Sequence, residues 1–448
     1  MDELKFENIL DSLEECIESE DIERLKAILS EIHPADIAHM FGHFNRFEQN
    51  YIFDLLPAET ASEVLVELSE LEKERMLKKL DEERLMKIVD ELESDEAADV
   101  LAAVEPEVAE KVLDALPDED SLELRQLLTY DDETAGGIMG TEMAVVHETS
   151  TVKEAISEIR EVAEDVDDIY TVWVVDAEGV LKGRISLKDS ILAKSSTLVK
   201  EIYRDDAISV PLDMDQEEAA QMMQKYDLVS MPVIDKKGRL VGRITWDDAM
   251  EVLNEEASED MGHISGTGGE EPGIRSVFHS MKKRLPWLIT GLFGGVVSAW
   301  IMSEYVHSLE ALIALTFFIP IITAMGGNVG IQSSSIVVRG LAIGEITYRG
   351  TGQRIMKELG VALLNGMILS IILCIVILLW QNLLFESLVI SMSLIIVILT
   401  AALVGVTAPL MLSKLNIDPA LAMGPFVTIS NDILGVFIYL FLTTTLLF

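Results

Sequence analysis

One carboxylate lies near the middle of the last apolar segment of the sequence. Asp432 follows Thr428 by one helical turn, Ser430 and Asn431 add oxygen donors, and the segment holds no His or Cys. Burying a carboxylate at the bilayer centre costs roughly 3 kcal/mol, so such a group normally faces water or a cation. Oxygen donors favour Mg²⁺, Ca²⁺ or Mn²⁺ over zinc or copper. The pattern predicts a divalent cation site, and the alternative is a protonated Asp432 that is hydrogen-bonded to a neighbouring helix.

A single carboxylate is a weak ligand set for a small divalent cation. Mg²⁺ keeps several of its waters when it binds to proteins. Two copies of the chain around a symmetry axis would present two carboxylates to one hydrated ion. Five membrane spans also cannot divide into the two equal repeats of many transporters. We therefore expect a symmetric oligomer with the ion path on or near its axis.

Five apolar segments of about 20 residues or more are long enough to cross a bilayer. They are residues 286–306, 311–338, 361–380, 388–412 and 420–447. The Lys and Arg residues that flank them all fall on one side if the N-terminus is cytoplasmic and the C-terminus is outside. The first seven residues also lack the features of a secretory signal peptide. The sequence thus predicts a multi-pass protein of the cell membrane, with its N-terminal part in the cytoplasm and its C-terminus outside.

The charge of the chain is concentrated before these apolar segments. Of 77 acidic and 34 basic residues, only seven and five lie from Leu285 onward, which leaves a net charge of −41 in the preceding part. A body this acidic repels phosphate, so we expect no nucleic-acid partner. Metal cations or polycations fit it better. The two cysteines, Cys16 and Cys374, lie in different halves of the chain and do not favour a disulfide or a thiolate metal site.

Two of the spans carry distinctive glycine patterns. Gly291 and Gly295 in the first span have the GxxxG spacing that lets helix backbones approach closely. The second span contains Pro320 and then, in residues 325–330, three glycines around an asparagine. We predict that this run opens the helix locally and lines a cavity, because irregular backbone is not tolerated against lipid. The alternative is a glycine-rich packing face.

Residues 56–128 contain a 12-residue repeat. One apolar series is Leu56, Leu68, Leu80, Leu92, Val104, Leu116 and Leu128, and the second is Val64, Met76, Ile88, Val100, Val112 and Leu124. The repeat predicts helices of under three turns that stack into a superhelical bundle, with caps such as Asp81, Ser94 and Asp118. The acidic residues between the two series would form the outer face, and an ordinary solvated surface is the alternative.

A longer duplication occupies residues 140–260. Residues 172–189 match residues 231–248, and each copy has the pattern of a strand, an Asp/Gly turn, a strand and a Ser/Thr-x-x-Asp helix start. The pair resembles two CBS modules, which form regulatory α/β units and in which this carboxylate can hold an adenosine ribose. The resemblance places Asp189 and Asp248 there and adds Tyr170 as a stacking ring. ATP is thus a candidate ligand, although many CBS pairs bind no nucleotide.

An acidic amphipathic helix is predicted after the second copy of this duplication. Residues 247–260 carry seven carboxylates in fourteen residues and lead towards the first span. A position between a sensor pair and the membrane spans favours a gating role for this helix.

Over its whole length the chain resembles the MgtE family of magnesium channels. The resemblance is carried by residues 133–139 (ETAGGIM), 326–330 (GGNVG), 338–342 (VRGLA) and 418–432, which begin with DPAL and end with Asn431-Asp432. It implies a multidomain membrane protein. The expected parts are an all-α superhelical N domain (1–130), an α/β tandem CBS pair (131–203 and 204–260), an acidic plug helix with its linker (247–280) and a five-helix transmembrane pore domain (281–448).

The same resemblance implies a homodimer in the lipid bilayer with Mg²⁺ as both substrate and regulator. Hydrated Mg²⁺ would bind at Asp432, with Asp418 at the inner mouth of a pore lined by Asn328, Thr428 and Asn431. Regulatory Mg²⁺ would bind carboxylates of the N domain, the CBS pair and the plug helix: Glu63, Asp95, Asp99, Glu217, Asp227, Asp248, Glu251, Glu256, Glu259 and Asp260. The sequence departs from the family pattern at Ile331, Gly424 and Glu251, which leaves the secondary pore ligands open.

The predicted function is a Mg²⁺-selective uptake channel that cytosolic Mg²⁺ closes by bridging carboxylates. A Mg²⁺ exchanger coupled to Na⁺ or H⁺ is the main alternative, and a Ca²⁺, Mn²⁺ or Co²⁺ pathway is another. An enzyme or receptor with a membrane anchor is disfavoured. The sequence has no nucleophile–base pair, P-loop or HExxH motif, and its five spans exceed what anchoring requires.

Overall fold

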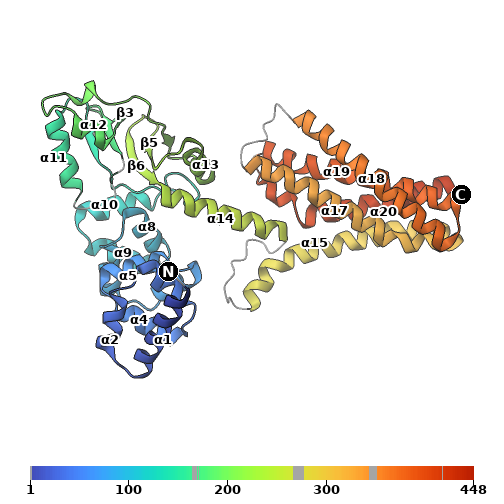
Figure 1. Ribbon diagram of the computed structural model, residues 1–448, viewed down its shortest axis with the longest axis horizontal. Coiled ribbons are helices and arrows are strands. Elements are labelled where there is room, and N and C mark those ends of the chain that lie inside the picture. Colours follow the sequence, from blue (N-terminus) through green and yellow to red (C-terminus); the bar gives the residue numbers. More distant parts are fainter. Residues whose placement is uncertain (1–2, 164–168, 170, 266–276, 343–350, 416) are drawn as a thin grey trace. The chain divides into compact units, whose positions relative to one another are not determined.

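The computed structural model describes residues 3–163, 169, 171–265, 277–342, 351–415 and 417–448. The chain forms two compact units, Met1–Leu253 and Asn254–Phe448 (Figure 1). The first unit contains short helices followed by two small sheets, and the second contains the long apolar helices.

Ten helices form residues 3–127 of the first unit. They are α1 (Glu3–Glu18), α2 (Ile22–Leu29), α3 (Pro34–Phe41), α4 (Arg46–Leu55), α5 (Ala58–Val66), α6 (Glu70–Leu77), α7 (Glu82–Val89), α8 (Ser94–Ala102), α9 (Pro106–Ala115) and α10 (Asp118–Leu127). Helices α5 to α10 begin every 12 residues and each has eight to ten residues. The second apolar series of the repeat, from Val64 to Leu124, is 5% exposed or less. The predicted repeat is therefore confirmed.

The predicted caps of these helices are only partly right. Asp81 accepts a hydrogen bond from the Arg84 backbone N–H and caps α7. Ser94 and Asp118 are instead the first helical residues, and the N-cap residues Glu93 and Pro117 make no side-chain capping bond. The Ser94 hydroxyl donates to Glu142, 48 residues away in sequence, so a tertiary contact takes the place of the local cap.

The two copies of the duplication fold into two equivalent three-stranded sheets. The first contains β1 (Val145–His147), β2 (Val172–Val175) and β3 (Leu181–Ile185), and the second contains β4 (Val210–Pro211), β5 (Ser230–Ile234) and β6 (Leu240–Thr245). In each sheet the first two strands are parallel and the last two antiparallel. The helices of these modules are α11 (Val152–Val162), α12 (Leu187–Leu192), α13 (Gln216–Tyr226) and α14 (Trp246–Ser265), with a 3₁₀ turn at Val199–Glu201. The predicted α/β pair is confirmed.

Each sheet also receives an additional backbone segment beside its last strand. Arg204 exchanges two backbone hydrogen bonds with Arg184 of β3, and Gly140 exchanges two with Arg243 of β6, all between 2.8 and 2.9 Å. The approach is close because the preceding strand residues, Gly183 and Gly242, have no side chain. A Cβ at residue 183 would collide with Arg204 O, and one at residue 242 would collide with Met139 Sδ and Gly140 O. Equivalent positions of the two modules therefore face different neighbouring segments.

The second unit contains five helices long and apolar enough to cross a membrane, as predicted. They are α15 (Val277–Glu304), α17 (Ala314–Ala342), α18 (Thr351–Gln381), α19 (Leu384–Lys414) and α20 (Pro425–Leu447), with a short α16 (Val306–Ala311). Helix α19 is the most enclosed and contacts α17, α18 and α20. The Tyr439 hydroxyl of α20 donates to Leu315 O of α17 over 2.9 Å and joins two helices distant in sequence.

The expected opening of the second span is wrong. Helix α17 runs unbroken through residues 325–330. Its glycines serve close packing instead: Gly330 lies against Asn431 and Val427 of α20, and Gly405 of α19 faces the Gly330 carbonyl. The alternative of a packing face is the correct one.

The irregular backbone lies at the start of the fifth span. A 3₁₀ turn (Pro419–Ala422), capped by Asp418, precedes Gly424, whose φ of 56° is in the left-handed region that favours glycine. Helix α20 therefore begins at Pro425, five residues after the predicted start of the span.

The contact between Gly405 and Gly330 gives a direct test of this packing. A Cβ at residue 405 would lie 2.5 Å from Gly330 O, and a backbone atom cannot move aside as a side chain can. We expect Gly405→Ala to destabilise the purified protein by about 1–3 kcal/mol, measured as a lower temperature of thermal unfolding in detergent. Gly360→Ala is the matched control, because a Cβ at residue 360 meets nothing within 4 Å. Equal melting temperatures for both variants would contradict the packing described.

Candidate functional site

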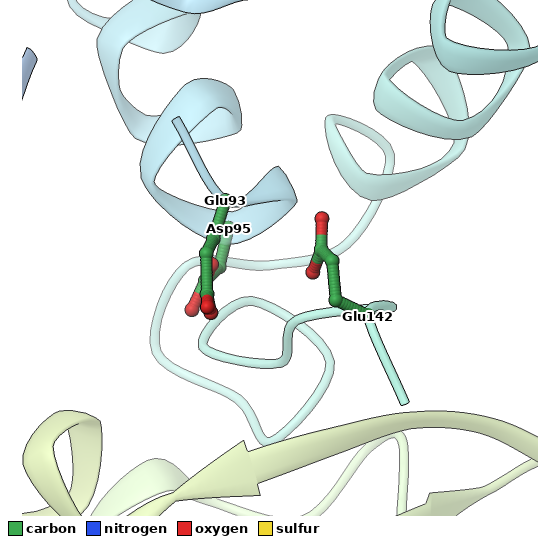
Figure 2. A group of neighbouring side chains, drawn as sticks. All are labelled: Glu93, Asp95 and Glu142. Atoms are coloured by element: carbon green, nitrogen blue, oxygen red, sulfur yellow. The ribbon is translucent and has the colours of Figure 1, made fainter. Parts of the chain in front are cut away.

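Three carboxylates converge in the first unit where α8 meets the segment after α10. One oxygen from each of Glu93, Asp95 and Glu142 lies within 4.8 Å of the other two. Figure 2 shows Glu93 and Asp95 side by side at the start of α8, with Glu142 facing them from across the gap. Among the residues that the structure describes, no other group of three His, Cys, Asp or Glu side chains meets this criterion. Oxygen donors alone form the group, as Mg²⁺ or Ca²⁺ requires.

Three hydrogen bonds fix the position of the Glu142 carboxylate. Its Oε1 accepts from the Ser94 backbone N–H over 2.8 Å, and its Oε2 accepts from the Ser94 hydroxyl over 2.9 Å and the Thr141 N–H over 3.1 Å. Gly140 leaves room for the approach, since a Cβ there would lie 3.1 Å from Glu142 Oε2 and 3.5 Å from Asp95 Oδ1. The same backbone segment that pairs with β6 thus carries Glu142 to the start of α8.

Asp95 is the most enclosed member of the group. The residue is 9% exposed, and its Oδ1 is buried without a hydrogen-bond partner. Leaving a buried charged acceptor unpaired is costly. A cation held by the three carboxylates would satisfy this atom, so the residues present fit a bound divalent cation.

The electrostatics of the cluster favour the same ligand. Loss of hydration raises the pKa of Glu93 and of Glu96 to about 7, and neighbouring carboxylates add to both shifts. Burial, followed by the charge of Asp248, raises the pKa of Asp95 well above its usual value. Arg243 acts against the shift of Glu93, because its Nη2 lies 3.7 Å from Glu93 Oε2. Such uncompensated charge is neutralised either by protons or by a metal cation.

A lysine takes the central place in a second acidic group. Lys73 Nζ lies 3.0 Å from Glu70 Oε1, and only 11% of the lysine side chain is exposed. Loss of hydration raises the pKa of Asp99 to about 6 and also raises the pKa of Glu251. The charge of Lys73 acts against both shifts. An ammonium group therefore partly neutralises two of the predicted metal ligands.

The equivalent aspartates of the two modules have different neighbours. In the second module Asp248 accepts hydrogen bonds from the N–H and hydroxyl of Thr245, and burial raises its pKa. In the first module the equivalent Asp189 instead forms an ion pair with Arg204, 3.2 Å away. Asp248 contributes to the field of the acidic cluster, whereas Asp189 lies beside arginine.

The other predicted regulatory residues are dispersed over several elements. Glu63 is exposed on α5, Glu217 is in the first turn of α13, and Asp227 is the C-cap of that helix with a φ of 52°. Glu256, Glu259 and Asp260 lie on α14. Tyr170 lies outside the described residues. The metal roles of these residues stay predictions.

Sequence reasoning missed Glu93 and Glu142. Glu93 belongs to neither apolar series of the 12-residue repeat, and Glu142 lies outside the matching stretches 172–189 and 231–248. Their only sequence signal is proximity, Glu93 to Asp95 and Glu142 to the 133–139 stretch, and that signal does not reveal the 48-residue contact between Ser94 and Glu142.

In the second unit the predicted pore residues separate into two groups. Asn328 is exposed and Asp432 and Thr428 are partly exposed on the surface of the protomer, whereas Asn431 is only 2% exposed and lies against Gly330. The period of α20 therefore turns Asn431 into the helix bundle of the single chain, and the pore-lining roles of Asn328, Thr428 and Asn431 stay predictions. Asp418 is exposed and accepts a hydrogen bond from the Ala420 N–H over 2.8 Å. Gln332, which was not predicted, shares the exposed face of Asn328 one turn further along α17.

Comparison with known proteins places the chain in a family. Residues 319–442 match the model of the divalent cation transporters called MgtE, residues 32–133 match the MgtE intracellular N domain, and residues 135–189 and 199–255 match CBS domains. A curated relative, the magnesium transporter MgtE of Thermus thermophilus, is 36% identical over 98% of this chain and 99% of its own length. The chain belongs to the MgtE family.

A further MgtE protein and two solved structures agree with this placement. The magnesium transporter MgtE of Enterococcus faecalis is 37% identical over 72% of the chain and 71% of its own length. The cytosolic domain of the Mg²⁺ channel MgtE in complex with ATP is 38% identical, with a TM-score of 0.52 over 55% of this chain and all of that structure. The soluble part of a magnesium transporter is 28% identical, with a TM-score of 0.51 over 56% and 99%. The MgtE-type helical domain and CBS pair are thus confirmed.

The raised pKa values predict an unusual pH dependence of stability in the absence of divalent cations. Folded Glu93 and Glu96 titrate near pH 7 against 4.5 for an ordinary glutamate, so between these values the folded state holds more protons than the unfolded state. Their contribution is fully present below about pH 4.5, decreases as the pH rises and is lost above about pH 7. Solvent reaches 38% of the Glu93 side chain, so screening reduces its share.

Thermal unfolding in detergent and EDTA checks this expectation. A Glu93→Gln, Glu96→Gln double variant should melt a few degrees higher than the parent at pH 8 and at nearly the same temperature at pH 5. A parent that gains stability relative to the variant as the pH rises would contradict the assigned shifts.

Proposed function

We propose that this chain transports Mg²⁺ across the cell membrane through a path between two copies of the chain. The observation that carries the proposal is a polar face on a membrane-spanning helix. Asn328 and Gln332 are exposed on α17 in the middle of an otherwise apolar stripe, and the partly exposed Asp432 lies on α20, which packs against α17. Uncovered polar side chains are expensive in lipid and normally face protein or a water-filled path.

The depth of these residues supports a shared path. Gly327 of α17 lies opposite Thr428, and Gly330 lies opposite Asn431, so the segments 327–330 and 428–431 are at the same level. Asn328 and Asp432 therefore lie close to one level of the bilayer. A second copy related by a two-fold axis would add the same groups and give a hydrated ion two carboxylates. The homodimer, the channel-type path and an outside C-terminus form part of this proposal.

The acidic cluster supports the proposal that cytosolic Mg²⁺ regulates transport. Metal-free carboxylates at Glu93, Asp95 and Glu142 repel one another, and a bound cation would join the start of α8 to the segment that pairs with the second module. One site filled at tenfold its dissociation constant contributes roughly 1.4 kcal/mol. Moving a gate from about 1:99 to 99:1 requires roughly 5.5 kcal/mol, or about four such sites. Loss of Mg²⁺ would loosen these contacts and, through the acidic helix α14, open the path.

A nucleotide is the second regulatory ligand that we propose, at the first module. Arg184, Arg204 and Ser186 line a cleft there, and Asp189 stands in the position that holds ribose in CBS modules. The ATP-bound MgtE cytosolic domain, at 38% identity, adds support.

The transport proposal predicts a strong effect of Asp432→Ala on Mg²⁺ flux. Losing a charge-assisted contact to the hydrated ion removes roughly 1.5–3 kcal/mol, so flux into proteoliposomes should fall about ten- to a hundredfold. Glu304→Gln, an exposed acidic residue at the end of α15, is the control and should transport like the parent. Normal flux through the Asp432 variant at equal reconstitution would refute the proposed path.

The regulatory proposal predicts opposite shifts from two variants. Limited proteolysis of the full-length protein should slow as Mg²⁺ is added. Glu142→Gln keeps an acceptor for the Ser94 N–H but loses the charge, so the midpoint should move to about tenfold higher Mg²⁺. Lys73→Gln removes the ammonium that competes at Asp99 and Glu251, so its midpoint should move lower.

Glu82→Gln is the control for both, because Glu82 forms only an exposed ion pair with Lys111. Proteolysis that is insensitive to Mg²⁺ in the parent would overturn the gating mechanism, and identical midpoints in all variants would overturn these sites.

A further inference from the structure

The cleft of the first module is small and basic. It has a volume of about 80 Å³ and is lined by Thr171, Arg184, Ile185, Ser186 and Arg204. This is room for two or three waters, or for one small anionic group. Ser186 also caps α12 by accepting a hydrogen bond from the Asp189 N–H over 3.1 Å. The cleft therefore lies directly beside the carboxylate of the Ser/Thr-x-x-Asp motif.

The two arginines that line this cleft each form an ion pair with an aspartate. Arg204 Nη2 lies 3.2 Å from Asp189 Oδ2, while Arg184 holds Asp206 through two contacts of 3.0 and 3.3 Å. The two arginines are adjacent because their backbones exchange hydrogen bonds across the edge of the sheet. In this state Arg204 occupies the carboxylate on which a ribose would bind.

We propose that Arg204 is the specificity-determining residue that makes the first module select phosphorylated adenine nucleotides over adenosine. This inference rests on the nucleotide site proposed above. A ribose that binds to Asp189 must displace the Arg204 guanidinium. A ligand with phosphates then supplies a new counter-charge for that guanidinium, with two-pronged hydrogen bonds that suit arginine. Adenosine would displace the same guanidinium but has no anionic group to pair with it.

The exposure of the ion pair between Arg204 and Asp189 makes this exchange of partners feasible. Arg204 and Asp189 keep 62% and 31% of their side-chain surfaces exposed, and ion pairs at such sites hold weakly. Breaking the pair thus costs a phosphorylated ligand little. Arg184 is less available, because its bidentate contact with Asp206 occupies it and its own side chain is 39% exposed.

The second module shows what the absence of this arginine does. Gly140 takes the place of Arg204 as the neighbour of the last strand, and Glu142, two residues further along that segment, belongs to the acidic cluster with Glu93 and Asp95. Arg243, the counterpart of Arg184, lies 3.7 Å from Glu93 and is a cation of this module. The carboxylates would repel a phosphate there. One arginine on the added segment therefore separates an anion-selecting module from a cation-selecting one.

Calorimetric titration of the full-length protein in detergent with ATP and with adenosine tests the inference. EDTA is present throughout, so that the response of the acidic cluster to Mg²⁺ does not contribute. The parent should bind ATP more tightly than adenosine. Arg204→Gln should weaken ATP binding about tenfold, while adenosine binding stays equal or strengthens about two- to fivefold because Asp189 is already released. Arg204→Lys keeps the charge without the two-pronged geometry and should lie between them.

Two control variants separate the outcomes. Lys236→Gln removes a cation from an exposed ion pair in the second module and should leave both affinities unchanged. Asp189→Asn should weaken ATP and adenosine alike. If the parent binds neither ligand, the proposed nucleotide site is wrong. If Asp189→Asn abolishes binding but Arg204→Gln leaves the ratio of ATP to adenosine affinity unchanged, the site stands and the role of Arg204 is overturned. Equal weakening of both ligands by Arg204→Gln would also overturn it.

Discussion

The first unit depends on carboxylates that the fold brings together without enough positive charge to neutralise them. Asp95 has a buried oxygen with no partner, and the two neighbouring glutamates, Glu93 and Glu96, titrate near neutrality because they lose hydration beside other acids. Three hydrogen bonds hold Glu142 in this group although its charge adds to the repulsion. Without a cation these carboxylates repel one another, and a bound cation would remove the repulsion. A change in Mg²⁺ concentration can therefore shift the equilibrium between two states of this region. The regulatory proposal rests on this imbalance of charge.

The backbone segment beside the last strand of the sheet brings residues of opposite charge in the two modules. Gly183 and Gly242 both allow a neighbouring backbone segment to reach the last strand of the sheet. The segment contributes Arg204 in one module and leads to Glu142 in the other. The aspartate of the duplicated Ser/Thr-x-x-Asp motif thus forms an ion pair with Arg204 in one module and adds its charge to the acidic cluster in the other. In our proposal the added segment, rather than the motif, sets the ligand class, and the motif alone is weak support for any particular ligand.

The periodic features of the fold could be predicted from the sequence, and the contacts between them could not. The 12-residue helices, the two sheets and the five apolar helices each follow from a repeating pattern of apolar residues. Glu142 reaches Ser94 through the pairing of Gly140 with Arg243, which no local pattern encodes. The role of the glycines in the second span could not be decided from the sequence for the same reason. Whether they open α17 or pack it depends on the neighbouring helices, and here Gly330 and Gly405 meet too closely for a side chain.

The membrane site shows how such packing determines chemistry. Asn431 and Asp432 are adjacent in sequence, and successive residues of a helix point about 100° apart. Asn431 is seated against Gly330, where any side chain on α17 would collide with it. This contact fixes the rotation of α20 about its axis, and with that rotation Asp432 must turn towards the partly exposed side. The absence of a side chain at residue 330 is therefore a condition for turning the Asp432 carboxylate towards the partly exposed side, although Gly330 itself offers no ligand.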